Sequence, residues 1–214
     1  MAAKRRKRSR FGSFLILLGL LCVAGAVGLT IYNYWDANRA EKASSEIVKK
    51  MDEQMGGEED DEEPILLEDE EFRKMPTIMI DGYEYIGKLQ IPSLSLDLPV
   101  MMEWDYDRLK ISPCRYSGSY FSNDLVICAH NYARHFSPIK GISMGADVWF
   151  ITADNKRIHY ITSNIQTIQP TSIEDMVDNV RNSGTSNNEW DMTLFTCNTG
   201  GQTRCAVRCT RIED

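Results

Sequence analysis

The segment TLFTCNTGGQTRCAVRC, residues 193–209, holds residues that could carry out nucleophilic chemistry. Two strand-like runs flank a Gly-Gly turn, a pattern typical of a β-hairpin. With NTGGQT as the loop, Cys197 on the first strand lies directly opposite Arg204 on the second, with Cβ atoms about 4.5–5.5 Å apart. A nearby guanidinium lowers the pKa of a thiol and can hold the oxyanion of a tetrahedral intermediate. The spacing therefore predicts a cysteine nucleophile, Cys197, supported by Arg204.

The alternation of strand side chains assigns the other hairpin residues. Cys205, Val207 and Cys209 lie on the face opposite to Arg204 and are expected to be core. Arg208 shares the face of Arg204, but four residues along a strand is about 13 Å, too far for both guanidinium groups to serve one sulfur. Arg204 is therefore the expected partner of the thiol. Arg208 takes its place only if the hairpin register differs.

Cleavage of an amide also needs an acid that gives a proton to the leaving amine. The chain has three histidines. His159, in KRIHYIT, lies in the middle of a strand-like run and is expected to be structural, whereas His135 lies in a polar loop, in a supporting or surface position. His130 directly follows the apolar run LVICA, so a strand would deliver it to a loop mouth. We therefore expect His130 to be the general acid.

The motif LVICAHN, followed by TLFTC and by an arginine seven residues later, resembles the sortase family of Gram-positive surface transpeptidases. The match covers essentially the whole expected domain. Ala129 and Asn131 fit the residues that flank the histidine of the family. The resemblance implies that the catalytic histidine, cysteine and arginine of sortases correspond to His130, Cys197 and Arg204.

The resemblance implies acyl transfer in two steps. Cys197 attacks the Thr–Gly-type bond of a sorting signal (Leu-Pro-x-Thr-Gly-like or a variant) near the C-terminus of a secreted protein. His130 protonates the departing amine, and Arg204 stabilises the oxyanion. A cell-wall amine, on a lipid-linked peptidoglycan precursor, then resolves the thioester. No metal ion or cofactor is required by this chemistry.

The resemblance also implies a substrate groove. Phe195 and Ala206 would form its floor, and Thr196 and Asn131 are further candidates for contact with the peptide. The Asp-Pro-aromatic lid of pilin-building sortases is absent, and the stretch at 169–190 is shorter than in typical class B enzymes. In the family this stretch forms the wall that reads the sorting signal. The class (class B-like or a related clostridial type), the pentapeptide and the amine acceptor therefore stay open.

From Met75 onward, strand-like runs alternate with turn signals. The runs are YEYIGKLQI, LDLPVM, DLVICA, DVWFIT, RIHYIT, MTLFT and RCAVRC. Helical signals occur only around 135–142 and at 171–180, where Thr-x-x-Glu resembles a capping box. Many strands with few helices indicate a mainly β barrel, and the resemblance implies a closed barrel of the sortase type with about eight strands. We expect a catalytic domain at 75–214, monomeric and with its core wholly inside these limits.

The N-terminus indicates a membrane anchor. Residues 1–10 carry six basic side chains, and residues 11–35 carry no charge. The apolar run FLILLGLLCVAGAVGLTIYNYW is long enough to span a bilayer as one helix. Lys and Arg stay on the cytoplasmic side, so the domain is expected outside the cell, on a single-pass anchor. A cleaved signal peptide is the alternative, and the span behind the basic run disfavours nucleic-acid binding.

Residues 36–74 are expected to be an extracellular polar linker. Their first part, DANRAEKASSEIVKKMDEQM, could continue the helix outward or form a short coil. Ten acidic residues then fall within 58–71, and such a run repels itself and cannot bury a core. Much of the net charge of −7 comes from this run, so the charge says little about the ligand of the domain.

Two questions stay open from the sequence. Cys22 lies in the membrane span, and Cys205 and Cys209 are too far apart along one strand to pair, whereas Cys114 and Cys128 could be free thiols or form a bridge. The function has two alternatives. One is another extracellular cysteine peptidase, and the other is a sortase-fold protein that binds or assembles partners without catalysis.

Overall fold

The N-terminal part of the chain forms one long helix, α1 (Arg10–Met55). The computed structural model describes residues 10–56, 74–177 and 190–212, so most of the basic tail and the acidic run of the linker lie outside the described residues. The chain divides into two compact units, residues 1–39 and 40–214. In the first unit, α1 is apolar, exposed and long enough to cross a membrane, with a mean hydropathy of 2.6 over its most apolar window.

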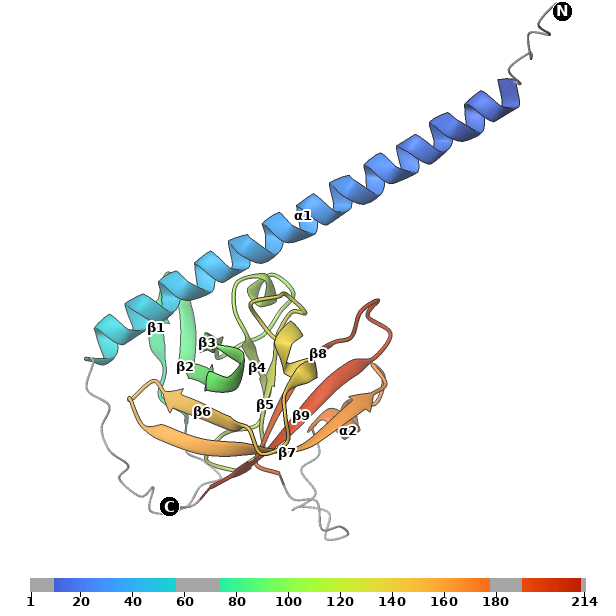
Figure 1. Cartoon of the computed structure of the whole chain (residues 1–214). Helices are drawn as coiled ribbons and strands as arrows, with labels where there is room; N and C mark the ends of the chain where they lie inside the picture. The colour runs from blue at the N-terminus through green and yellow to red at the C-terminus, as the bar shows by residue number, and fades with distance from the viewer. Residues whose placement is uncertain (1–9, 57–73, 178–189, 213–214) are drawn as a thin grey trace, which may run out of the picture. The chain divides into compact units, whose positions relative to one another are not determined.

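The second unit is built on a β-barrel (Figure 1). Strands β2 to β9 form a ring in the order β2-β3-β4-β5-β8-β9-β7-β6, and β6 pairs with β2 to close it. This confirms the expected closed barrel of eight strands. The short strand β1 adds to the edge of β2. The strands are β1 (Ile78–Ile80), β2 (Tyr83–Ile91), β3 (Leu96–Met101), β4 (Cys114–Ser117), β5 (Leu125–Cys128), β6 (Asp147–Thr152), β7 (Arg157–Ile168), β8 (Met192–Cys197) and β9 (Arg204–Arg211).

Gly87 allows the ring to close. The β2–β3 ladder is irregular between Tyr85 and Gly87, and from Gly87 onward β2 pairs with β6. Gly87 has a φ of 148°, and a Cβ at this position would lie 2.1 Å from the carbonyl oxygen of Ile151. Only glycine tolerates such a close approach of two backbones. The ring therefore depends on the absence of a side chain at this position.

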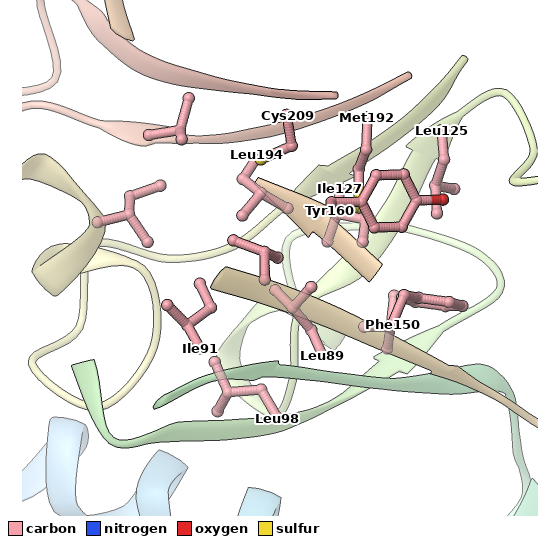
Figure 2. Close-up of a cluster of buried hydrophobic side chains, with 14 of the residues drawn as sticks. Leu89, Ile91, Leu98, Leu125, Ile127, Phe150, Tyr160, Met192, Leu194 and Cys209 are labelled. Atoms are coloured by element: carbon pink, nitrogen blue, oxygen red, sulfur yellow. The ribbon is translucent and has the colours of Figure 1, made fainter. Parts of the chain in front are cut away.

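The interior of the barrel is filled by side chains that recur at every second position of the strands, as a buried strand face requires. Figure 2 shows part of this cluster, with side chains from β2, β3, β5, β6, β7, β8 and β9 directed toward one another. Its members include Leu89, Ile91, Leu98, Leu125, Ile127, Phe150, Tyr160, Met192, Leu194 and Cys209. Cys205 and Val207 also belong to it, so the predicted core face of the last strand is confirmed.

A second buried cluster uses the alternate residues of the same strands. It contains Val126 and Cys128 of β5 together with Ile47 and Met51 of α1. The expectation that the core lies wholly after residue 75 is therefore wrong. The helix does continue outward through the polar stretch, and one face of it is buried at Ala40, Ser44, Ile47 and Met51. These positions recur at helical spacing, which identifies residues 40–55 as an amphipathic segment of the barrel unit.

Ion pairs secure the same helical segment. Lys50 Nζ lies 2.5 Å from Asp81 Oδ2, and Lys88 Nζ lies 2.5 Å from Asp52 Oδ1. Lys88 is largely buried while its partner is half exposed, so this pair also satisfies a charge within the barrel wall. The segment is thus held to the barrel by apolar burial and by charge.

The remaining helical elements are short. The expected helix around 135–142 is a 3₁₀ helix, Ser137–Gly141. The expected helix at 171–180 is α2 (Ile173–Val177), and the rest of that prediction lies outside the described residues. Two further 3₁₀ turns, Pro92–Leu94 and Arg108–Lys110, have no counterpart in the sequence predictions.

Candidate active site

The β8–β9 hairpin has the predicted register. Cys197 is the direct partner of Arg204, and Phe195 is the partner of Ala206. Inside the loop, Asn198 N donates to Thr203 O at 2.9 Å. Gly200 and Gly201 both have positive φ angles, of 84° and 72°, a conformation that glycine adopts without strain. The Gly-Gly turn therefore fixes which residue faces Cys197.

Burial separates Cys197 from the other cysteines of the barrel unit. Cys114, Cys128, Cys205 and Cys209 are buried, whereas Cys197 is partly exposed at the end of β8, and all six cysteines of the chain are free thiols. Burial raises the pKa of both Cys128 and Cys209 to about 12. Buried thiols of this kind stay protonated and unreactive. Position alone therefore favours Cys197 as the reactive cysteine.

Cys114 and Cys128 are direct partners across the β4–β5 ladder, which is why a bridge could not be excluded from the sequence. In the structure both are free, and Cys128 Sγ lies 3.5 Å from the carbonyl oxygen of Cys114. Burial raises the pKa of Cys114 as well.

A parallel strand pair brings His130 to the same end of the barrel. β5 runs parallel to β8, with Cys128 in register with Phe195. His130 and Cys197 each lie two residues beyond this pair. The ladder extends one step further, because Ala129 N donates to Phe195 O at 3.2 Å. Parallel strands end at the same edge of a sheet, so the histidine and the thiol leave the sheet together.

Thr196 has a different position from the one expected of a substrate contact. Its side chain is 1% exposed, and its Oγ1 donates to the carbonyl oxygen of Ala129 at 2.8 Å. The strand alternation that exposes Cys197 turns Thr196 the other way. Thr196 therefore ties β8 to the residue that precedes His130, and its side chain is not available to a peptide.

The loop that begins at His130 is closed on itself. Phe136 N donates to the carbonyl oxygen of His130 at 3.2 Å. The ring of Tyr132 stacks on the ring of His130, with centroids 4.6 Å apart and an interplanar angle of 22°. Asn131 Oδ1 accepts a hydrogen bond of 2.5 Å from Lys140 Nζ. His130 is thus part of a hydrogen-bonded turn, and the side chain of Asn131 is bonded to Lys140.

Arg204 is held by its own loop. Its Nη1 donates to the carbonyl oxygen of Gly201 at 2.9 Å and to that of Thr203 at 3.2 Å. The guanidinium therefore lies over the hairpin loop, next to the strand end that carries Cys197. It supplies a fixed positive charge to this edge of the barrel.

Arg208 is buried and hydrogen-bonded to its neighbours, as expected of a residue that stabilises the fold. It is 1% exposed, and its guanidinium donates to Thr193 Oγ1 at 2.7 Å, to Met176 O at 3.0 Å and to Asp175 O. It also lies over the ring of Trp190, 4.5 Å from the centroid. Burial lowers the pKa of Arg208 to about 10, so it stays charged at neutral pH. Arg208 joins α2 to Trp190, the residues on either side of segment 178–189, and that segment lies outside the described residues.

An aromatic series extends from Phe195, two residues before Cys197, through the partly buried Tyr116 to the exposed Trp104. Ala206 is completely buried and Phe195 is 8% exposed, so both are more enclosed than a groove floor would require. The ring of Tyr116 meets the ring of Phe195 edge-on, with centroids 5.2 Å apart. The ring centroids of Trp104 and Tyr116 are also 5.2 Å apart. This aromatic series was missed in the sequence, because Trp104 and Tyr116 come from a loop and a short strand without a motif.

An open pocket lies on the other side of Arg204. Ile168 at the end of β7 is the direct partner of Arg204. The pocket, of about 580 Å³, is lined by Gln166, Thr167, Ile168, Gln169, Ser172, Asp175 and Trp190. One strand therefore separates it from Cys197.

Comparisons with known proteins agree with this architecture. A sortase domain family model matches residues 89–212, more than half of the chain. Sortase A of Bacillus anthracis is 22% identical over 196 residues, which cover 86% of each chain. Sortase C of Streptococcus pneumoniae has a TM-score of 0.56 and 20% identity over 79% of this chain and 97% of its own. Sortase A of Corynebacterium diphtheriae has a TM-score of 0.52 and 18% identity, and the match spans 62% of each chain.

The family-model match includes His130, just after β5, and the strands that carry Cys197 and Arg204. Strands β3 to β9, with the parallel β5–β8 pair and the β8–β9 hairpin, lie within the residues that the family model matches, whereas β2 begins before them. The chain belongs to the sortase family.

Proposed function

We propose that this chain is a sortase transpeptidase that cleaves a C-terminal sorting signal of secreted proteins and joins the new carboxyl end to a cell-wall amine. The observation that carries the proposal is the meeting of two strand ladders. The antiparallel β8–β9 register pairs Cys197 with Arg204. The parallel β5–β8 register brings His130 to the same edge of the barrel as Cys197. A nucleophile, an acid and a fixed cation thus come from three strand ends.

In the first step, the thiolate sulfur of Cys197 forms a bond to the carbonyl carbon of the threonine in the signal. The π electron pair of the carbonyl moves to its oxygen, where the charge of Arg204 stabilises it. When the oxyanion collapses, the C–N bond breaks and protonated His130 gives its proton to the departing amine. The products are a thioester on Cys197, a free amine on the cleaved tail and a neutral imidazole.

In the second step, the acceptor amine attacks the thioester carbonyl, and neutral His130 takes up the proton that the amine loses. The C–S bond breaks, an amide forms, and the thiolate of Cys197 and protonated His130 are restored. The four buried cysteines take no part, because burial keeps them protonated.

The pocket beside Arg204 is our candidate for a side chain of the sorting signal. It is lined by both polar and apolar groups, among them Gln166, Ile168 and Trp190. Its lining comes from the end of β7, from the residues around α2 and from Trp190, on either side of the segment that the family uses to read the signal. Peptide specificity would then depend on Arg208, which holds α2 and Trp190 in place.

The test is turnover with a library of Leu-Pro-x-Thr-Gly-like and variant peptides, with an oligoglycine and with meso-diaminopimelate as acceptor amines. We expect mass spectrometry to detect cleavage after threonine, a ligated product, and an acyl-enzyme on the Cys197 peptide. Tight peptide binding without any cleavage would favour the non-catalytic alternative instead. Cleavage that never yields a ligated product would favour a hydrolytic cysteine peptidase.

We also propose that the catalytic unit lies outside the cell on a single-pass anchor. The basic cluster precedes the apolar span, and positive charge stays on the cytoplasmic side. With a tag at each end of the chain, protease added to intact cells should remove the C-terminal tag and spare the N-terminal one until lysis. Loss of the N-terminal tag with survival of the C-terminal tag would show the opposite orientation, and an intact cytoplasmic protein serves as the control.

A further inference from the structure

His135 is a buried titratable side chain that the proposed chemistry does not use. It is completely buried, and its Nε2 lies 3.1 Å from the Oγ of Ser44 on α1. The two residues are 91 positions apart in the sequence. A polar group is seldom buried without a specific partner, because desolvation is costly. Packing alone therefore does not explain the contact between His135 and Ser44.

The hydrogen-bond directions at Ser44 define the state of His135. Ser44 Oγ donates to the carbonyl oxygen of Ile111 at 2.8 Å. A hydroxyl has one proton to donate, so toward His135 the same oxygen acts as acceptor and Nε2 carries the hydrogen. Burial lowers the pKa of His135 to about 4, against a smaller opposite effect of the Ala40 carbonyl, so the ring is neutral. His135 is thereby fixed in one tautomer and one orientation.

His135 connects to His130 through Tyr132. The rings of His135 and Tyr132 lie 5.4 Å apart, and Tyr132 stacks at 4.6 Å on His130. The backbone supports this arrangement, because His135 N donates to the carbonyl oxygen of Tyr132 at 3.1 Å. The three rings form a continuous series, from the helix contact at Ser44 to the imidazole at the reactive edge.

A second contact joins the same loop to α1. Arg134 Nε lies 3.2 Å from Glu41 Oε1, with both side chains partly exposed. Glu41 lies three positions before Ser44 and is therefore close to it on the helix. The loop from His130 to Phe136 thus meets α1 at a buried pair and at a surface pair.

We propose that Ser44, acting through His135 and Tyr132, is a positioning residue for His130. The membrane-anchored helix then serves the reactive edge directly: Ser44 orients His135, His135 supports the ring of Tyr132, and Tyr132 sets the plane of the His130 imidazole. The catalytic part of this proposal rests on the proposed function, because it assumes that His130 transfers the proton. The structural part does not.

The experiment uses the full-length chain in detergent micelles and combines histidine NMR with steady-state kinetics. The three histidines of the chain can each be assigned by single substitution. The variants are Ser44→Ala, Ser44→Thr, which restores a hydroxyl, and Ser45→Ala as matched control. Ser45 is the neighbouring serine, exposed and bonded only along the helix, to the carbonyl oxygen of Glu41.

We expect Ser44→Ala to shift the ring resonances of His130 and His135 and to leave those of His159 unchanged, since His159 stacks on Trp149 in another part of the barrel. With a peptide substrate, kcat should fall about 10-fold, because small misplacements of a reacting group have large effects on rate. KM should stay within about 2-fold, because the peptide contacts are unaltered. Ser44→Thr should restore the wild-type ring resonances and the wild-type kcat. Ser45→Ala should match the wild type in both measurements.

A His130 resonance and a kcat that match the wild type in Ser44→Ala, together with a lower melting temperature, would overturn the proposal and leave Ser44 with a structural role only. If Ser44→Ala does not fold, His135→Asn carries the same test, since asparagine keeps an N–H donor for Ser44 and removes the ring beside Tyr132. If the wild type turns over no peptide, the proposed function fails, while the resonances still decide whether Ser44 positions His130.

Discussion

Replacement of Cys197 by alanine is expected to abolish both peptide cleavage and transfer, with a loss of more than about 10⁴-fold in kcat. In the proposed mechanism the sulfur of Cys197 forms the covalent intermediate, and no other thiol in the barrel unit can replace it. The four remaining cysteines there are buried, and burial raises the pKa of each. The measurement is turnover of the best peptide from the library, with mass spectrometry of the acyl-enzyme.

Cys205→Ala is the matched control for this prediction. Cys205 lies eight positions after Cys197 on the partner strand, but its side chain is 6% exposed and belongs to the barrel core. Loss of this small buried side chain should lower the free energy of unfolding by roughly 1 kcal/mol and leave kcat near the wild-type value. Wild-type activity in Cys197→Ala would rule out the covalent mechanism.

Arg204→Ala and Arg204→Lys are both expected to lower kcat by about 10²–10³-fold, the usual effect of losing a donor to an oxyanion. Lysine keeps the charge but lacks the planar fork, so it is a poor replacement where two oxygens or a fixed direction matter. Arg204 is only half-buried and bonds to its own loop, so both variants should melt close to the wild type. The measurement is kcat of each variant with the peptide substrate, after circular dichroism has shown that the variant is folded.

Arg208→Ala should show the opposite pattern. Its removal leaves the buried acceptors Thr193 Oγ1 and Met176 O, and the less buried Asp175 O, without their donor, which should destabilise the fold by roughly 3 kcal/mol. At a temperature where the variant is still folded, the effect on kcat should be much smaller than for Arg204→Ala. An inactive Arg208→Ala beside an active Arg204→Ala would mean that the two arginines must exchange roles.

The hairpin was predictable because its signals are local. Alternation with period two and a Gly-Gly turn determine the pairing of Cys197 with Arg204, and no distant residue is needed for that inference. The same rule placed Cys205 in the core. His130 was also within reach, since it directly follows an apolar run. The roles of these residues in catalysis remain predictions, to be tested by the variants above.

The unpredicted features depend on contacts between distant segments. The polar stretch after Trp35 gave only weak helical periodicity, and nothing in it indicated that Ile47 and Met51 would be buried against the barrel. Strands β1 and β4 are three and four residues long, and neither has four consecutive apolar residues like the equally short β5. The complete burial of Arg208 requires knowledge of where α2 packs. Each of these outcomes is decided by tertiary structure, which local patterns do not encode.

The parallel pairing of β5 with β8 has a consequence for folding kinetics. The contact between Ala129 and Thr196 joins residues 67 positions apart, and the crossover between them contains β6, β7 and α2. Contacts of such high sequence separation form slowly, because the entropy of closing the loop opposes them until much of the chain is in place. A newly synthesised chain would therefore carry Cys197 and His130 on separate segments until the barrel has almost closed. The proposed active site therefore forms only when the barrel folds, and an incompletely folded molecule lacks it.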